Sequence, residues 1–290
     1  MIVARLILLF SVLSLHLSFL VPEKFQFVAR VMVEGEQYFS DPMGNVYVVK
    51  DNTLKKFSPG HKLVAEYTNA FLGNIHSADI SDPLRILLFY KENMQILWVD
   101  NYLAELRSPL WLDELGADQA ELVCSSSQGG FWVFSSLNNQ LLYFDVNLSL
   151  LHRGTTLNIL TGPDIRPVYM LEKNRSVYLN VPGTGILVFD RFGNYSTTLP
   201  ADVPDAFQVT DHYVYFTRDG GLIRCDLKTS EIVPLSLPGT GVADDKGSNP
   251  GEATQRDVGS PPGKILKAEL QPGLLYIYTP RSYWIYKTNP

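Results

Sequence analysis

The chain has 290 residues, of which 46% are hydrophobic and 12% aromatic, so it can bury a sizeable core and is too apolar to be disordered. Its net charge of −6 supplies no basic surface that could displace counterions from a phosphate backbone, which argues against nucleic acid as a partner. The aromatic content favours strands over helices, and one all-β domain is expected at this length.

The chain begins with a segment typical of an export signal. One basic residue, Arg5, precedes an apolar run over residues 6–21 that is broken only by serines and His16. About 16 residues would extend roughly 24 Å as a helix, which is short of the ~20 residues that a membrane span needs. We therefore expect a signal peptide at residues 1–21, with an uncleaved anchor as the alternative, followed by a single domain at residues 22–290. The mature protein would be periplasmic or extracellular and associated with the cell envelope.

Six short apolar runs recur along the rest of the chain and indicate a repeated unit. In each run a large residue follows a β-branched, aliphatic or aromatic one, and these large residues are Tyr47, Leu87, Trp132, Tyr178, Tyr215 and Tyr276. They lie about 37 to 46 residues apart except for the last interval of about 61, close to the length of one propeller blade. The long interval contains residues 238–264, a segment rich in Gly, Pro, Ser and Asp that we interpret as a flexible insertion.

Each run is followed, after a small polar turn, by a second apolar run, and this constant spacing indicates a hairpin. In four repeats the second run ends in an aspartate that is expected to accept hydrogen bonds from backbone N–H groups of the next turn. These aspartates are Asp100, Asp145, Asp190 and Asp226. Further strands are expected outside the hairpins, as at residues 103–106 and 232–235, and before them, as at residues 122–125, 167–171 and 206–209.

Four strands per unit predict an all-β fold, a six-bladed β-propeller of four-stranded antiparallel blades in which each blade covers the apolar face of its neighbour. The chain ends just after the third strand of the sixth unit. The segment at residues 25–33 alternates well enough to supply the missing strand, so the N-terminal strand is predicted to complete the last blade and close the ring. This closure also predicts that the C-terminus tolerates little truncation.

The first blade resembles a known repeat. Residues 41–60 begin Asp-Pro-Met-Gly-Asn-Val-Tyr-Val and continue through an Asn-containing turn into an apolar strand that ends in Phe57, which is similar to the NHL-type repeat. The other blades match this pattern in outline. The resemblance implies the six-bladed superfamily that includes NHL proteins and gluconolactonase-like enzymes, with seven blades as the alternative.

The sequence carries no clear signature of a catalytic site. The gluconolactonase-like enzymes that the fold resembles hold a divalent metal at the propeller axis, and the candidate ligands here are Asp41, Asp79 and Asp205, although no matching signature surrounds them. The sequence has no Gly-x-Ser-x-Gly elbow and no zinc spacing. We expect these carboxylates to cap turns, and we expect no cofactor, no metal and no catalytic residue.

The remaining side chains that bear on chemistry have simpler interpretations. Cys124 and Cys225 fall in different blades and are expected to be buried, unpaired thiols. His61, His152 and His212 fall in or near turns and are expected to be exposed to solvent. These residues therefore add no candidate for catalysis.

The sequence favours a non-enzymatic scaffold that holds a protein or peptide on one face of the propeller, where loops on a rigid frame gather. The predicted contact residues are Tyr90, Trp111, Asp164, Arg166, Arg218 and Arg281. For Trp111 the alternative is packing between blades. The insertion at residues 238–264 opens at this face, either as a lid or tether that orders on a partner or as a loop without a role.

We expect the protein to be a monomer by itself, and its partner to belong to the cell envelope, including a membrane-associated complex. A metal-dependent gluconolactonase-like hydrolase and a carbohydrate or small-ligand binder are the alternatives.

Overall fold

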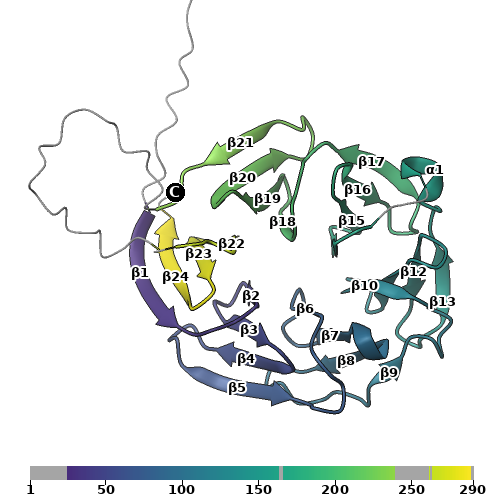
Figure 1. The fold of residues 1–290 in the computed structure, drawn as a ribbon, viewed down its shortest axis with the longest axis horizontal. Helices are drawn as coiled ribbons and strands as arrows, with labels where there is room; N and C mark the ends of the chain where they lie inside the picture. Colours follow the sequence, from purple (N-terminus) through teal and green to yellow (C-terminus); the bar gives the residue numbers. More distant parts are fainter. Residues whose placement is uncertain (1–24, 163–165, 239–260, 262, 289–290) are drawn as a thin grey trace, which may run out of the picture.

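The computed structural model describes residues 25–162, 166–238, 261 and 263–288. These residues form six four-stranded antiparallel sheets arranged around a central axis (Figure 1). The predicted all-β, six-bladed propeller is confirmed, and the alternative of seven blades is excluded. The predicted leader and most of the predicted insertion lie outside the described residues.

Each blade starts with a short strand near the axis and continues outward in chain order. Blade 1 contains β2 (Gln37–Ser40), β3 (Val46–Lys50), β4 (Thr53–Phe57) and β5 (Leu63–Thr68). Blade 2 contains β6 (Ser77–Asp79), β7 (Ile86–Tyr90), the 3-10 helix η1 (Lys91–Asn93), β8 (Gln95–Val99) and β9 (Leu110–Trp111). Blade 3 contains β10 (Ala120–Ser125), β11 (Phe131–Ser135), β12 (Gln140–Phe144) and β13 (Leu150–Arg153), and is followed by α1 (Asn158–Thr161).

The second half of the ring repeats this order. Blade 4 contains β14 (Tyr169–Lys173), β15 (Ser176–Val181), β16 (Gly185–Phe189) and β17 (Tyr195–Leu199). Blade 5 contains β18 (Phe207–Val209), β19 (Tyr213–Arg218), β20 (Gly221–Asp226) and β21 (Ile232–Leu235). Blade 6 contains β22 (Lys267–Gln271), β23 (Leu274–Thr279) and β24 (Ser282–Thr288), and its outer strand is β1 (Phe25–Met32).

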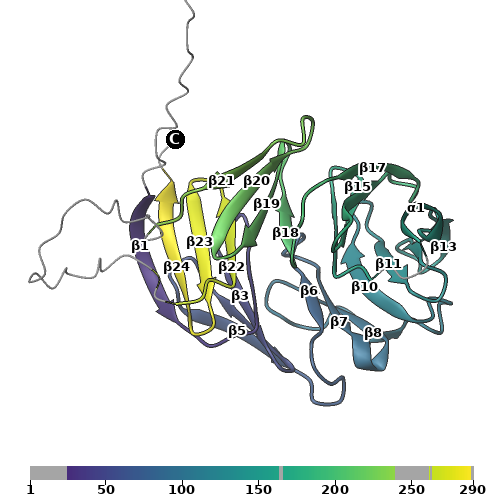
Figure 2. The ribbon, with the colours of Figure 1, turned by 45° about the horizontal axis from the view of Figure 1, so that its top comes forward.

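The two ends of the described chain close the ring. Strand β1 pairs antiparallel with β24, from Phe25 opposite Thr288 to Met32 opposite Ser282, with a register shift between Phe27 and Ala29. Figure 2 shows β1 alongside β24 at the outside of the last blade. The predicted closure by the N-terminal strand is therefore confirmed, and it leaves β24 without an open edge.

In most blades the second and third strands are buried on both faces, whereas β19 and β20 of blade 5 are only partly buried. All five residues of β7 and all five of β11 are buried, and the core clusters are shared between neighbouring blades. Phe89 of blade 2 and Phe131 of blade 3 lie in one such cluster. This two-sided burial explains why the sequence shows continuous apolar runs in these strands in place of strict alternation.

Several predicted strand bounds differ from the structure; for example, β10 begins at Ala120, two residues before its predicted start. Residues 103–106 form only an isolated bridge, Val99 to Glu105, and Leu103 has a φ of 62°, because Asp100 holds this stretch in a turn. The outer strand of blade 2 is instead β9. Strand β14 begins two residues later than predicted, because Pro167 has no N–H group to donate to the ladder.

The predicted aspartate turns are confirmed. Asp190 Oδ1 accepts the backbone N–H groups of Phe192 at 2.8 Å and Asn194 at 2.9 Å. Burial alone would raise the pKa of Asp190, but these hydrogen bonds outweigh it and lower the pKa. The other three turn aspartates also accept two backbone N–H groups each, and they are Asp100, Asp145 and Asp226.

The cysteines and histidines agree with prediction in part. Cys124 and Cys225 are both free and buried, as predicted. The prediction of solvent exposure holds for His212 but is wrong for His61 and His152, which are half-buried. The ring of His152 packs between two aromatic rings, those of Tyr143 and Phe192.

Candidate functional site

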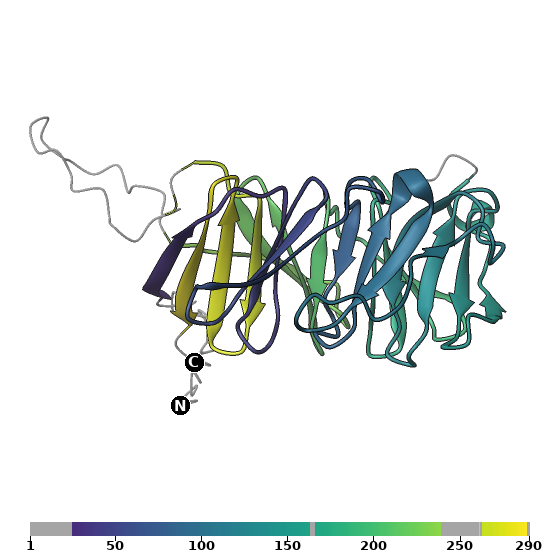
Figure 3. The same cartoon turned by 90° about the horizontal axis from the view of Figure 1, so that it is seen from below.

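The two faces of the disc carry different connections. In an antiparallel blade, the turn between the second and third strands and the connection to the next blade leave from the same edge. We name the face formed by these segments the loop face, and the opposite one the turn face. In Figure 3 the disc is seen edge-on, with η1 on the loop face at its upper edge.

The contact residues predicted in the first four blades have different outcomes. Tyr90 ends β7 at the loop face but is fully buried, so its predicted contact with a partner is corrected: the two-sided burial of this strand leaves its last side chain inside. Trp111 is 47% exposed, and Arg166 is exposed in the connection between blades 3 and 4. Asp164 lies outside the described residues.

The two remaining arginines lie on the loop face of blades 5 and 6. Arg218 ends β19, with its guanidinium 3.9 Å from the carboxylate of Asp202 and 5.9 Å from the ring centroid of Phe216. Arg281 lies in the turn between β23 and β24, where its carbonyl accepts the N–H of Val33 at 3.1 Å. Within the described ranges no hydrogen bond or ion pair joins the predicted contact residues to one another, so they share a face without forming a cluster.

A chain of polar contacts crosses the loop face from blade 2 to blade 3. The Lys91 ammonium, in η1, forms an ion pair with the carboxylate of Glu121, in β10. The same carboxylate accepts the hydroxyl proton of Ser136 at 3.3 Å. Neighbouring loops are therefore held to each other by side chains.

The chain of contacts continues at both ends. Toward blade 4, the side-chain amide of Asn139 donates to Asn158 Oδ1 at 2.7 Å, which ties the turn after β11 to α1. Toward blade 1, the side-chain amide of Asn93 donates to the carbonyl of Leu72 at 2.9 Å. One fixed surface is thus formed by four segments: the connection from blade 1 to blade 2, the turn that contains η1, the turn between β11 and β12, and α1.

Large apolar side chains project from this surface. We name as the apolar ridge the exposed residues Phe71 (94% exposed), Leu137 (53%), Trp111 (47%) and Leu160 (36%). Sequence reasoning found Trp111 but missed the other three. Each of the three lies in a connection outside the repeated strand pattern, and that position was the signal that could have found them.

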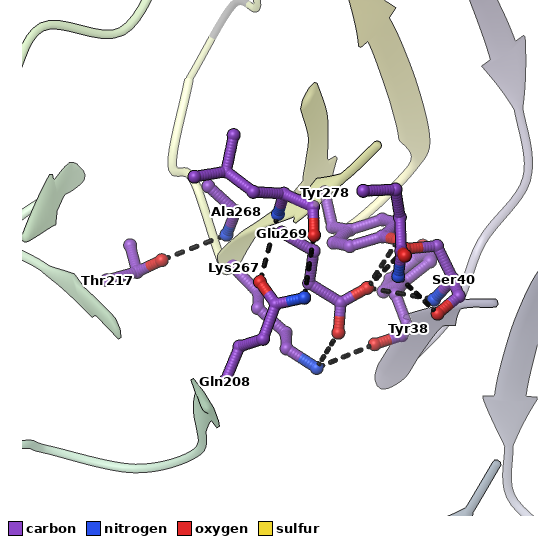
Figure 4. Close-up of polar contacts among 10 residues, drawn as sticks. Tyr38, Ser40, Gln208, Thr217, Lys267, Ala268, Glu269 and Tyr278 are labelled. Atoms are coloured by element: carbon purple, nitrogen blue, oxygen red, sulfur yellow. Dashed lines mark hydrogen bonds and ion pairs between the residues drawn. The ribbon is translucent and has the colours of Figure 1, made fainter. Parts of the chain in front are cut away.

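A second polar cluster, centred on a buried carboxylate, lies near the central axis. Figure 4 shows Glu269, in β22, accepting hydrogen bonds at 2.8 Å from the backbone N–H and the hydroxyl of Ser40, in β2. Its carboxylate also accepts the hydroxyl of Tyr278 at 2.8 Å and pairs with the Lys267 ammonium at 2.5 Å. This buried carboxylate is therefore fully used in joining the first blade to the last.

Blade 5 is joined to blade 6 in a similar way. The amide of Gln208 donates to the carbonyl of Leu270 at 2.6 Å and accepts its N–H at 3.0 Å (Figure 4). The hydroxyl oxygen of Thr217 accepts the N–H of Ala268 at 2.9 Å. The groups that line the axis here hold the scaffold together.

Two of the three metal-ligand candidates from the sequence, Asp41 and Asp79, behave as structural acceptors. Asp41 is fully buried and accepts hydrogen bonds from Met43, Asn45 and Tyr47. Asp79 accepts the N–H groups of two serines, Ser81 and Ser125. The side chain of Asp205 is exposed. In the part of the chain that the structure describes, no group of three or more His, Cys, Asp and Glu side chains could hold a metal ion.

The comparisons with known proteins bear on the fold. No family model matches the chain, and no protein with a curated description matches it. Among solved structures, a chain of the mitotic checkpoint complex is similar at 11% identity and a TM-score of 0.59, covering 99% of this chain and 100% of that chain. Virginiamycin B lyase from Staphylococcus aureus is similar at 10% identity and a TM-score of 0.58, covering 92% and 100%.

A third similar structure is BamB from Moraxella catarrhalis, at 10% identity and a TM-score of 0.51, covering 92% of this chain and 98% of that chain. Identities this low show the fold alone. The chain is a six-bladed β-propeller. Among the described residues no helix is both long and apolar enough to cross a membrane.

Proposed function

We propose that this propeller is a non-enzymatic module that binds a protein or peptide partner on its loop face. The observation that carries the proposal is the apolar ridge, which leaves Phe71 94% exposed in a chain that buries most of its other phenylalanines. Burying one such side chain contributes about 1.5–3 kcal/mol, which stays unrealised until a partner covers it. Exposed apolar patches with a polar border are typical of interaction surfaces.

The ridge is presented rigidly, which favours binding. The N–H of Phe71 donates to the side-chain oxygen of Asn69 at 3.0 Å, and the next residue, Leu72, is buried. The loop is therefore fixed on both sides of the exposed ring. A surface that needs little ordering loses less entropy when it binds, so more of the contact energy contributes to affinity.

The arginines predicted from the sequence are proposed as the polar border of this surface. Arg166, Arg218 and Arg281 lie on the same face as the ridge, and Asp164 is proposed to join them. Arginine and aromatic side chains supply much of the energy at protein interfaces. Tyr90 is not part of the proposed surface because it is buried.

The proposal is preferred over catalysis on the same fold. The similar structures include a lyase and a chain of a multiprotein complex, so the fold does not choose between these classes of function. In this chain the buried carboxylates Asp41 and Glu269 are used by hydrogen bonds of the scaffold. The side chains of the apolar ridge, in contrast, remain exposed to solvent.

Export to the cell envelope is part of the proposal. Its support is the sequence of residues 1–21, in which one basic residue precedes an apolar run that is short for a membrane span. The partner is then a protein of the envelope or exterior, including one in a membrane-associated complex. The propeller itself is proposed to be a monomer.

The test compares two triple variants of the full chain. The first carries Phe71→Asp, Leu137→Asp and Leu160→Asp on the ridge. The second carries Val64→Asp, Leu151→Asp and Ile232→Asp on the outer strands, where the residues are also exposed and the charge change is the same. Affinity capture from the native source should recover a partner with the wild type and the outer-strand variant, and lose it with the ridge variant. Equal recovery with both variants would contradict the proposal.

A further inference from the structure

A cavity of about 470 Å³ opens on the turn face, opposite the apolar ridge. It is lined by the ends of the inner strands and the turns that follow them in three successive blades, at residues 81, 82 and 85, residues 125–127 and 129, and residues 172–175. This volume is in the range of sites that bind small molecules. We name it the turn-face cavity.

The ionised side chains that line the cavity are Arg85, Lys173, Arg175, Asp82 and Glu172. Both carboxylates are used by protein donors. Glu172 accepts the N–H and hydroxyl of Ser127 at 2.9 and 2.5 Å, and the indole N–H of Trp132 at 2.8 Å. Asp82 accepts the N–H of Leu84 at 3.0 Å. The cations outnumber the carboxylates, and Lys173 and Arg175 are exposed.

Arg85 is fixed in the wall of the cavity by two contacts. Its guanidinium lies 4.8 Å from the ring centroid of Trp98 and donates to the carbonyl of Gly129. A second guanidinium, that of Arg107, lies 5.7 Å from the same ring. Burial lowers the pKa of Arg85, and the positive charge of Arg107 lowers it further, against an opposing effect of Asp82. An anion bound in the cavity would stabilise the positive charge of Arg85.

Two exposed apolar side chains lie beside residues that line the cavity, although they are not part of its lining. Leu84, next to Arg85, is 64% exposed. Val146 is 55% exposed and packs against Gly129, where an added Cβ would lie 2.8 Å from its methyl carbon. A ligand that covers these side chains would need an apolar portion as well as a charge.

We propose that the turn-face cavity binds a small organic anion, a carboxylate or a phosphate ester, whose charge is held by Arg85, Lys173 and Arg175 and whose apolar portion covers Leu84 and Val146. The site lies on the face opposite the proposed docking surface and uses none of its residues. Ligand and partner could therefore occupy the propeller together.

Trp98 gives the site a reporter, because its indole ring contacts the guanidinium of Arg85. The purified protein is titrated with benzoate, phenyl phosphate and the neutral benzamide while tryptophan emission is followed. Benzoate or phenyl phosphate should give a saturable change that weakens as salt is added, and the stronger of the two identifies the anionic group. Binding of benzamide as tight as that of both anions, or no saturable change with either anion, would overturn the proposal.

Two charge variants complete the test. Lys173→Gln with Arg175→Gln removes the exposed cations of the cavity and should weaken anion binding about tenfold or more. Lys62→Gln with Lys228→Gln removes the same charge from exposed turns on the turn face of blades 1 and 5, and should leave the affinity unchanged. Circular dichroism and thermal melting confirm that both variants are folded. Equal weakening of anion binding by the two variants would show that the effect depends only on the net charge of the protein, and would overturn the proposed site.

Discussion

Glu269, on the inner strand of the last blade, accepts two hydrogen bonds of 2.8 Å from Ser40, on the inner strand of the first blade. These residues are 229 positions apart in the chain. The ring is thus closed twice: by backbone pairing of β1 with β24 at its outside, and by this side-chain contact next to the axis. The stability of this propeller therefore depends on the closure of its ring.

Replacing Glu269 by alanine should lower the free energy of unfolding by about 3–5 kcal/mol, because Ser40 and Tyr278 would lose their buried acceptor and the Lys267 ammonium, 18% exposed, would lose its ion pair. Urea denaturation measures this change. The matched control is Glu66→Ala. The Glu66 carboxylate lies on the outer strand β5, 3.7 Å from the ammonium of Lys55 in β4, and both side chains are exposed. It should cost no more than about 1 kcal/mol. Similar losses for the two variants would contradict the role of Glu269 in closure.

Removing residues up to 33 deletes β1 and exposes the edge of β24 together with the ring of Trp284, which Phe27 contacts at 5.8 Å. The truncated protein should melt at a lower temperature and associate through the open edge. A synthetic peptide of residues 25–33 should restore the melting temperature, and a scrambled peptide should not. Full stability of the truncated monomer would show that β1 is dispensable.

Stability should fall steeply in alkali. Burial raises the pKa of Tyr38, Tyr67 and Tyr276 to about 12, whereas an unfolded tyrosine ionises at a pKa of about 10. Between about pH 10 and 12 the unfolded chain therefore binds fewer protons than the folded one, so the stabilisation is complete below pH 10 and is lost as the pH rises through this window.

Ultraviolet absorbance of phenolate, followed together with circular dichroism, tests this pH dependence. The buried tyrosines should ionise only as the fold is lost, and Tyr276→Phe should make the alkaline transition shallower. Tyr102→Phe, at a position 77% exposed, is the control and should leave the transition unchanged. Ionisation of all tyrosines near pH 10 with the fold intact would contradict the expected shifts.

Asp41 should matter for stability and not for metal. Asp41→Ala leaves the side-chain amide of Asn45 and the hydroxyl of Tyr47 buried without their acceptor, and should cost about 2–4 kcal/mol. Asp205→Ala, at an exposed position, should cost less than about 0.5 kcal/mol. Thermal melting of both variants and the wild type, with calcium and with a chelator, measures the effect. A metal-dependent shift in the wild type that both variants abolish would favour the hydrolase alternative.

The sequence was sufficient for the fold because its repeats are local. The apolar runs, the turn aspartates such as Asp190 and the alternation of residues 25–33 each predict strands that the structure confirms. Side-chain direction was less accessible. Strand β7 is buried on both faces, so no alternation distinguishes an inward from an outward Tyr90.

The surfaces depend on residues far apart in the sequence. Phe71 is exposed in a loop where its N–H donates to Asn69, and composition alone does not indicate this exposure. The turn-face cavity needs the turns of three blades side by side, and its cations Arg85 and Arg175 are 90 positions apart in the numbering. Only the assembled ring brings them together.

Photo-crosslinking in the source cells tests the docking surface most directly, with a photoreactive amino acid placed at position 71 in the full-length protein. The same amino acid at position 151, on the outer strand β13, and at position 84, on the turn face, provides the comparison. The docking account predicts a discrete crosslinked protein from position 71 and none from position 151 or 84. Crosslinks from position 151 or 84 with none from position 71 would contradict it.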